Sequence, residues 1–534
     1  MPQVTSKIIR FAAQDWLAGL SQQYDTSLGA LPPIAGAGNT LLKGIDPFRA
    51  LGYLSPAPLA ASPTNASAIS EVLMNIAYGQ ESTTSYGYMI EQGSKLHRLA
   101  LSTFTISNSG SWPHTVTGTG AITGDDCISY PVNVSGTRTR SILYSWNDSG
   151  GAWNVGKFNT SAGTFDDDWF TTVPAGTFTP SGNANRHPLF VGVDDVCYVG
   201  DGNKVHAIDG YTGTDGTVSE EVLTLPSDFV ITAFAQYGVY IAVFAYKQHA
   251  SATLATSSSA STTNATCFLW NPLELDIETS VTLNDDFVSS ARSFNNTIIC
   301  FTHGAQPAAE VNGATRLSRL KMFDGSRFVT VKSFIGNPPL YGGVAIMNDS
   351  IHWLSNNGNV FVYGSPYEDV QAGLNITNDA TGTSQGLYAI TPGGSGYAIA
   401  SSGTSTSGGL ERFKTSYADS ATYISGAATP SLGPGEVAQV KSVTVYFGKT
   451  MSAADGQVTV SLISENATTT GVISNLNQVT TSNIVKKVSY TTSGTKPPRF
   501  QELRLAVTFS GSSATQVPLI RYVDVEYEIK NSYP

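Results

Sequence analysis

The chain has 534 residues, of which 13% are charged, and a formal net charge of −11 at pH 7. Average soluble proteins carry roughly a quarter charged residues, so we expect a neutral polar surface rich in Gly, Ser, Thr and Asn. The negative balance, without a block of Lys and Arg, argues against recognition of a phosphate backbone as the main task. The length allows more than one domain.

The first residues do not form an export signal. Lys7 and Arg10 are basic, but Gln14 and Asp15 interrupt the apolar stretch that such a signal requires. No run approaches the length of about 18 apolar residues that spans a membrane. We therefore expect synthesis in the cytoplasm without a signal peptide, and no membrane span.

Residues 1–70 are predicted to form an extended N-terminal arm. A short helix is expected around Ile8–Leu20, and the prolines and glycines that follow forbid long helices and remove ladder donors. The segment is nevertheless too apolar for a solvated linker. Two interpretations stay open, a strap packed on its own domain or an arm that docks on a neighbouring subunit. The candidate subunit-interface residues are Trp16, Phe48, Arg49, Tyr53 and Leu54.

A hairpin signature returns along residues 71–435. It consists of an apolar strand, a turn of Gly, Asn or Asp, and a second strand, and it occurs at residues 88–99, 196–208 and 350–363. Such turn residues supply the positive φ angles that a tight reversal requires. Seven candidate units recur along the region, which predicts a β-propeller of six or seven blades. Their centres are Tyr88, Leu143, Cys197, Tyr240, Ile299, Trp353 and Tyr397.

Three tracts rich in Ser, Thr, Gly or Ala interrupt these strands, at residues 249–265, 371–386 and 401–409. We predict them to be surface loops, with a contact surface for another protein or a glycan as the alternative.

Longer strands with regular alternation begin after residue 435. Residues 456–463 and 503–509 place apolar side chains at every second position, which is typical of antiparallel sheets with one polar face. We predict a β-sandwich over residues 436–534. The predicted fold class is therefore all-β, with an extended arm, a propeller and a C-terminal antiparallel sandwich.

No catalytic, cofactor-binding or metal-binding residues are predicted. The cluster Asp166–Asp168 lacks the spacing of a calcium loop and is interpreted as a solvated turn. None of the seven histidines forms an H-x-x-x-H pair, and no nucleophile elbow, phosphate loop or dinucleotide motif is present. We therefore expect a protein that is not an enzyme. The four cysteines, Cys127, Cys197, Cys267 and Cys300, lack C-x-x-C spacing, so a disulfide-stapled fold is not indicated. Cys197 and Cys300 lie in apolar strand patterns and are expected to be buried free thiols.

Residues 148–153 resemble the Asp-box turn of sialidase-type propeller blades, with aspartate, glycine and tryptophan at the usual offsets. Trp146 stands where that motif begins with Ser or Thr. The resemblance implies a structural role, in which the Asp fixes a turn and the Trp packs beneath it. Trp112, Trp169 and Tyr211 are expected at blade tips, where aromatic faces could stack on sugars or act as packing anchors.

The order of the regions resembles virion structural proteins of tailed bacteriophages. The features are the apolar, Pro- and Gly-rich arm with its segment 44–56 (GIDPFRALGYLSP), a divergent propeller and a terminal sandwich. Tail nozzle proteins of short-tailed phages similarly place a propeller within a ring of subunits. The resemblance implies a tail component that contacts identical subunits and other virion proteins, and DNA at most by passage.

The alternative from another class is a propeller that binds or cleaves host-surface glycans. A plain extracellular adhesion propeller is a third interpretation, which the missing export signal disfavours.

Overall fold

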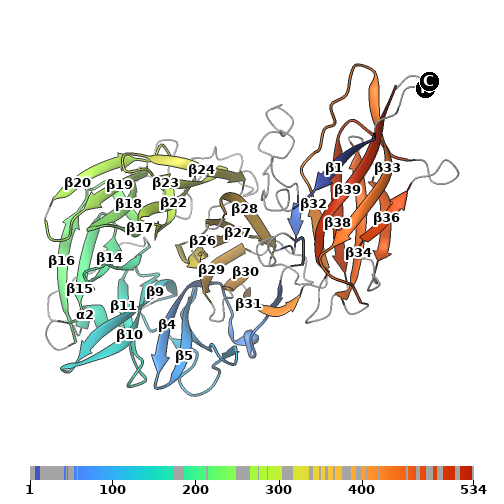
Figure 1. Ribbon diagram of the computed structural model, residues 1–534. Coiled ribbons are helices and arrows are strands. Elements are labelled where there is room, and N and C mark those ends of the chain that lie inside the picture. The colour runs from blue at the N-terminus through green and yellow to red at the C-terminus, as the bar shows by residue number, and fades with distance from the viewer. Residues whose placement is uncertain are drawn as a thin grey trace. The chain divides into compact units, whose positions relative to one another are not determined.

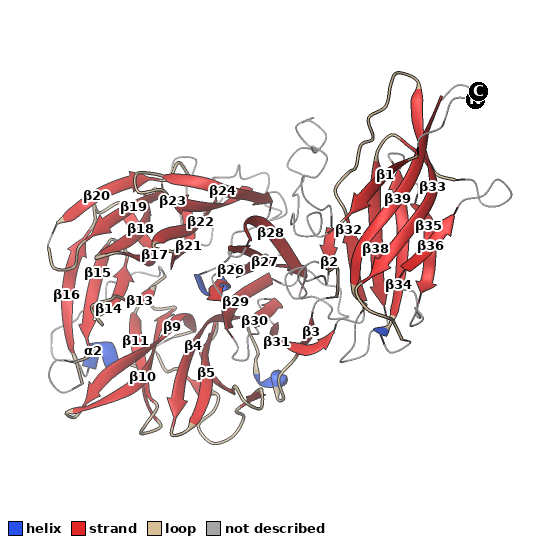
Figure 2. Cartoon of the chain, in the orientation of Figure 1, coloured by secondary structure: helices blue, strands red, loops and turns tan. Residues whose placement is uncertain are grey.

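The computed structural model consists almost entirely of antiparallel strands (Figure 2), which confirms the all-β prediction. Contacts divide the chain into unit 1 (1–61, 359–382 and 413–534) and unit 2 (62–358 and 383–412). The structure describes residues 6–12, 41–43, 45, 53–56, 58–118, 120–172, 186–211, 215–247, 265–274, 276–285, 287–303, 317–335, 339, 341–347, 350–354, 359–364, 367–375, 386–392, 398–404, 407–417, 420–452, 455–464, 469–476, 485–489, 497–510 and 518–531.

Seven of the described sheets each begin with a strand in unit 2. These first strands contact one another in chain order, and the last of them contacts the first, so they close a ring (Figure 1). Inner strands of this kind are shielded from water on both faces, which explains their β-branched and aromatic content. The first strands are β4 (Leu73–Glu81), β9 (Ile122–Val134), β13 (Leu189–Val191), β17 (Phe229–Tyr237), β21 (Phe287–Phe294), β25 (Val344–Met347) and β29 (Gly386–Pro392).

The second strands coincide with the predicted units. Six of the seven predicted centres lie within second strands, and Tyr397, outside the described residues, directly precedes the seventh. The tight turns use the expected residues, because Gly202, Asn295 and Asn296 have φ angles of 57°, 47° and 61°. The second strands are β5 (Thr84–Glu91), β10 (Thr137–Asp148), β14 (Cys197–Asp201), β18 (Tyr240–Lys247), β22 (Thr297–His303), β26 (Ser350–Leu354) and β30 (Ala398–Thr404).

The third and fourth strands complete the sheets. Side chains become more exposed from the inner to the outer strands of a sheet. In the fourth sheet β18 is almost wholly buried, whereas most side chains of the outermost strand are exposed. The third strands are β6 (Lys95–Ala100), β11 (Trp153–Asn159), β15 (Lys204–Asp209), β19 (Ala265–Trp270), β23 (Leu317–Phe323), β27 (Asn359–Gly364) and β31 (Ser407–Tyr417). The fourth strands are β7 (Thr105–Ile106), β12 (Thr164–Asp166), β16 (Thr217–Thr224), β20 (Ile277–Thr282), β24 (Phe328–Ile335), β28 (Tyr367–Asn375) and β3 (Pro58–Ala61), and β8 (His114–Thr115) also pairs with β6.

Helical structure among the described residues is confined to single turns. They are α2 (Trp169–Thr172) and the 3₁₀ turns η1 (Ala66–Ala68) and η4 (Tyr341–Gly343). No described helix has the length and apolar character needed to cross a membrane.

Two of the predicted loop tracts contain strands. Residues 371–375 belong to β28, and residues 401–404 and 407–409 belong to β30 and β31, so the loop prediction is wrong there. Small polar residues weaken the sequence pattern of a strand, but pairing with neighbouring strands still satisfies their backbone groups. Residues 249–264 lie outside the described residues.

Unit 1 contains two five-stranded antiparallel sheets. Strands β34 and β38 alternate strictly between buried and partly exposed positions over most of their length, as predicted. One sheet has the order β1 (Lys7–Phe11), β39 (Ile520–Asn531), β33 (Glu436–Phe447), β36 (Val485–Ser489), with β37 (Arg499–Phe500) beside β33. The other has the order β2 (Leu41–Lys43), β32 (Ser420–Ile424), β38 (Leu503–Ser510), β34 (Gln457–Ser464), β35 (Thr469–Leu476).

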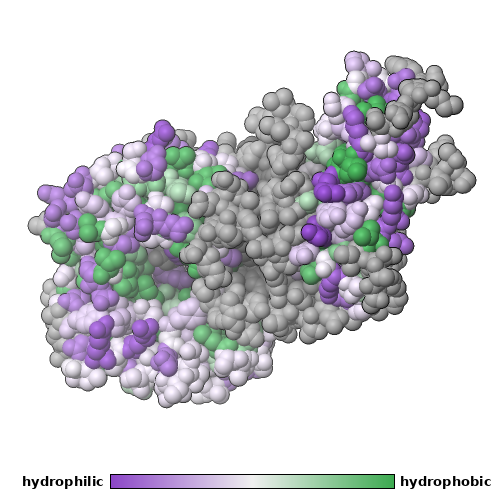
Figure 3. Space-filling model, in the orientation of Figure 1, coloured by the Kyte–Doolittle hydropathy of each residue, from purple (hydrophilic) through white to green (hydrophobic). Residues whose placement is uncertain are grey.

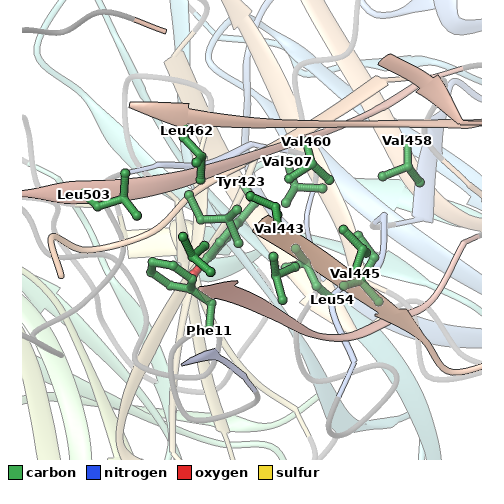
Figure 4. Close-up of a cluster of buried hydrophobic side chains, with 14 of the residues drawn as sticks. Phe11, Leu54, Tyr423, Val443, Val445, Val458, Val460, Leu462, Leu503 and Val507 are labelled. Carbon is green, nitrogen blue, oxygen red and sulfur yellow. The ribbon is translucent and has the colours of Figure 1, made fainter. Parts of the chain in front are cut away.

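One buried cluster collects apolar side chains from both sheets (Figure 4). Phe11 from the start of the chain lies in it with Val443 and Val507 from the C-terminal strands. The helix predicted around Ile8–Leu20 is wrong over Ile8–Phe11, because these residues belong to β1, a strand paired with β39. Its alternating Ile9 and Phe11 gain more by joining the core than a short isolated helix would.

Candidate functional site

A central cavity lies inside the ring of first strands of unit 2. It has a volume of about 510 Å³, within the range of roughly 300–1,000 Å³ typical of small-molecule sites. All seven first strands contribute to its wall, through residues 75–78, 127–129, 189–191, 234–235, 292–293, 344–346 and 390–391, and Arg140 of β10 also lines it.

The wall of this cavity is mainly apolar. Ile128, Phe190, Phe234 and Ile346 are among the side chains that line it, and the charged ones are Arg140 and Arg292. No Asp or Glu of the described residues lines the cavity. The cavity therefore combines an apolar wall with positive charge.

Asp126 lies next to the cavity lining and is almost fully buried. Its carboxylate accepts hydrogen bonds from the Asn75 amide at 2.5 Å and from the backbone N–H of Leu189 at 3.0 Å. Burial raises the pKa of Asp126 to about 6, although Arg186 and Arg292 act in the opposite direction. The carboxylate ties β4 to β13 across β9.

A second cluster of buried ionisable groups joins the second and third sheets of the ring. His187 is fully buried, with Nδ1 at 3.3 Å from Asp125 Oδ2 and Nε2 at 3.6 Å from Asp201 Oδ1, the latter an ion-pair distance rather than a hydrogen bond. Asp201 also lies 3.5 Å from His206 Nε2. The Trp153 ring stacks on the His187 ring at 4.0 Å between centroids. We call Asp125, Trp153, His187, Asp201 and His206 the inter-sheet cluster.

The protonation state of His187 follows from these contacts. Burial alone lowers its pKa, but Asp125 and Asp201 outweigh burial and raise the pKa above the ordinary value. A charged His187 between two carboxylates compensates their buried charge. The cluster therefore stabilises the junction of the two sheets.

A repeated pair of an acidic residue and a histidine in the sequence indicates part of this cluster, and it was not among the predictions from the sequence. In the third sheet, β14 ends in Asp201 and β15 carries His206 at its third position. In the first sheet, β5 ends in Glu91 and β6 carries His97 at its third position, with 3.3 Å between Glu91 Oε1 and His97 Nε2. Alignment of the first two hairpins would have shown this repeated acid and histidine. His187 had no comparable signal.

The acidic cluster Asp166–Asp168 includes a turn at Asp167 and Asp168, and Asp168 is exposed as predicted, but Asp167 is partly buried and held by specific contacts. Asp167 accepts hydrogen bonds from the Tyr144 hydroxyl and the Thr117 backbone, and it contacts His114 Nε2 at 2.8 Å. These hydrogen bonds lower the pKa of Asp167 in spite of the opposing effect of burial. Its carboxylate holds the chain around Thr117 against β10. Among the described residues no group of three or more acidic, histidine or cysteine side chains could hold a metal ion.

The turn at Asp148 has the geometry that the Asp-box resemblance implies. Asp148 Oδ1 accepts hydrogen bonds from the backbone N–H groups of Gly150 and Ala152, both at 2.9 Å. Trp153 is 1% exposed beneath the turn. The structural role expected of Asp and Trp is confirmed.

Replacing Asp148 with alanine should lower the free energy of unfolding by about 1–3 kcal/mol, because two backbone donors lose their acceptor. Chemical denaturation followed by tryptophan fluorescence measures the loss. Asp148→Asn keeps one acceptor oxygen and should lose less; equal losses in the two variants would show that the turn does not depend on this oxygen.

The predicted sugar-stacking aromatics are mostly buried. Trp112 is 7% exposed and Trp169 is 0% exposed, so their placement at exposed tips is wrong, and both act as packing anchors. Tyr211 is partly exposed, and the Arg138 guanidinium lies 3.8 Å from its ring centroid. Of the three aromatic residues predicted to stack on sugars, Tyr211 alone is partly accessible to solvent, and Arg138 covers part of its ring.

The candidate interface residues of the arm are described only in part. Trp16, Phe48 and Arg49 lie outside the described residues. Leu54 is fully buried in the core of unit 1, and its backbone exchanges hydrogen bonds with Ile520 at 2.8 and 3.0 Å. Tyr53 is half-buried and packs closely on Gly448. The described arm residues thus pack on their own chain, and a role of the arm at a subunit interface stays a prediction.

Three exposed apolar side chains lie on turns at one end of neighbouring sheets. Val239 and Leu273 follow the first and third strands of the fourth sheet, and antiparallel order places both turns at the same end. Val193 follows β13, and its N–H donates to Gln236 Oε1 at 3.3 Å near the end of β17. Their exposed fractions are 74% for Val193, 63% for Val239 and 90% for Leu273. We call these three residues the turn patch.

All four cysteines are buried free thiols, which confirms the prediction for Cys197 and Cys300. Burial raises their pKa values well above the ordinary range. They behave as small apolar side chains.

Comparisons with known proteins show no family for this chain. No protein-family model matches it, and no curated relative does. Among solved structures it is similar to the β-propeller domain of Cps50 (Swd1) from Myceliophteria thermophila, with 9% identity, a TM-score of 0.38, and coverage of 67% of this chain and 96% of that one. At this TM-score the likeness supports no inference about the chain.

Proposed function

We propose that the chain is a non-enzymatic structural subunit of a bacteriophage virion, a tail component of the nozzle or tail-tip type that assembles through subunit contacts into a ring. In this proposal the ring of seven sheets is a seven-bladed propeller, and the two five-stranded sheets of unit 1 form a sandwich that includes the N-terminal strands. The resemblance in the order of regions and the ring of first strands support it.

The turn patch is the observation that supports assembly through subunit contacts. Single exposed apolar residues are ordinary, but Val193, Val239 and Leu273 lie at one end of adjacent sheets and are each more than half exposed. Burying such a side chain contributes about 1.5–3 kcal/mol. In the view of Figure 3, hydrophobic residues of unit 2 lie in several places among hydrophilic ones. The proposed partner of the turn patch is a neighbouring subunit.

The buried polar contacts elsewhere in unit 2 are those of a structural protein. Asp167 and the inter-sheet cluster join strands of the same chain, and their bonds fix the fold. DNA is too large for the central cavity of about 510 Å³, so any passage for it would be formed between subunits. The glycan-binding alternative is weakened by the burial of Trp112 and Trp169.

Charge placed on the turn patch tests the proposal. The triple variant Val193→Glu, Val239→Glu, Leu273→Glu should fold normally and lose assembly, because charged side chains oppose burial at an interface. Size-exclusion chromatography with light scattering measures the mass. The control Val329→Glu changes an exposed residue of the outer strand β24 and should assemble normally; normal assembly of the triple variant would overturn the role of the turn patch.

A further inference from the structure

We propose that the central cavity of unit 2 is a binding site for a small amphipathic anion, with the apolar part among the first strands and the charged head at Arg140 and Arg292. This site is separate from the proposed assembly contacts.

The size and wall of the cavity support a small apolar body. A volume of about 510 Å³ lies within the range of small-molecule sites and suits a short apolar chain. Ile128, Phe190 and Phe234 come from three different sheets and line the cavity together. Transfer of an apolar chain from water to such a wall is favourable by roughly 0.8 kcal/mol for each buried CH₂ group.

The charges of the cavity select the head group. Arg140 and Arg292 line it and no described carboxylate does. Guanidinium groups bind carboxylate, sulfate and phosphate oxygens in planar geometry.

The charge of Asp126 sets the affinity of the cavity for an anion, because a negative Asp126 offsets the positive charge of Arg292. The groups that act on Asp126 are Arg186, Arg292, the Asn75 amide and the Leu189 N–H, and the thiols of Cys127 and Cys197 lie within its influence. The pKa of Asp126 is about 6. Below this pH the carboxyl is neutral, so an anion should bind more tightly at pH 5 than at pH 8.

Calorimetric titration with octyl sulfate tests the site, because this anion keeps its charge across that pH range. We expect saturable binding of one molecule per chain, tighter at pH 5, with octyltrimethylammonium and octanol binding at least tenfold more weakly. Arg140→Gln should weaken binding about tenfold, the effect of a lost charge-assisted hydrogen bond. Arg327→Gln, on an exposed turn of the fifth sheet, should leave it unchanged.

Ile346→Trp fills the cavity from a side chain that is 37% exposed and lines the wall. It should abolish binding while the melting temperature without ligand stays near that of the parent chain. Undiminished octyl sulfate binding in this variant would place the ligand elsewhere and overturn the proposal. Equal affinity for the cation would overturn the assignment of the head group.

Discussion

Replacing His187 with leucine should lower the free energy of unfolding by about 3–5 kcal/mol at pH 6, because it removes the positive charge that lies between the buried carboxylates of Asp125 and Asp201. Asp125 and Asp201 are 6% and 3% exposed, so water cannot replace the lost partner. Trp153 would also lose the ring that stacks on it. Urea denaturation followed by tryptophan fluorescence measures the loss.

The same variant should show a pH dependence of known sign. The pKa of His187 is raised in the folded protein by its carboxylate partners, against the effect of burial. Its contribution to stability is therefore complete below the ordinary pKa of about 6.5 and is lost as the pH rises through the folded value. The difference between parent and variant should be larger at pH 6 than at pH 9. A difference that grows with pH would mean that His187 is neutral in the fold.

Deleting residues 1–60 should unfold unit 1 rather than merely prevent assembly. Phe11, Ile45 and Leu54 are 4%, 0% and 0% exposed within its core. Burial of three such side chains contributes roughly 5–9 kcal/mol, which is comparable to the whole stability of a domain. Hydrogen exchange of β33, β38 and β39 should show loss of protection in the truncated chain.

Strand β1 offers a matched pair of single variants for this prediction. Phe11→Ala should cost about 3–5 kcal/mol because it empties part of a close-packed core. Ile8→Ala, at a position that is 61% exposed on the same strand, should cost little. A truncated chain that keeps the protection of unit 1 would show that the N-terminal strands are dispensable. The deletion cannot separate folding from assembly, whereas variants of the turn patch can.

Local features of the fold were predictable from the sequence. The hairpins around Tyr88, Cys197 and Trp353 supply both the strand pattern and the turn residues within about a dozen positions. The alternation of β34 and β38 likewise records one buried face. Both signals are local, because a turn requires its own φ angles and a strand exposes every second side chain.

Long-range features were not predictable. Arg10 forms a bidentate pair with Asp524, at 2.7 and 2.9 Å, 514 positions further along the chain. A strand such as Lys7–Phe11 can pair with any free edge, and the packing of Ile9 and Phe11 together with the Arg10–Asp524 pair selects β39. His187 acquires its role from Asp125 and Asp201, which lie on separate strands. Contacts between residues that are distant in the sequence have no characteristic spacing by which they could be predicted.

Sedimentation velocity of the full chain over a range of concentrations shows whether the chain assembles with itself. We expect a discrete oligomer of identical copies, which electron microscopy shows as a closed ring and which the triple variant of the turn patch converts to monomer. A chain that remains monomeric at every concentration, with the parent and the triple variant sedimenting alike, would contradict it.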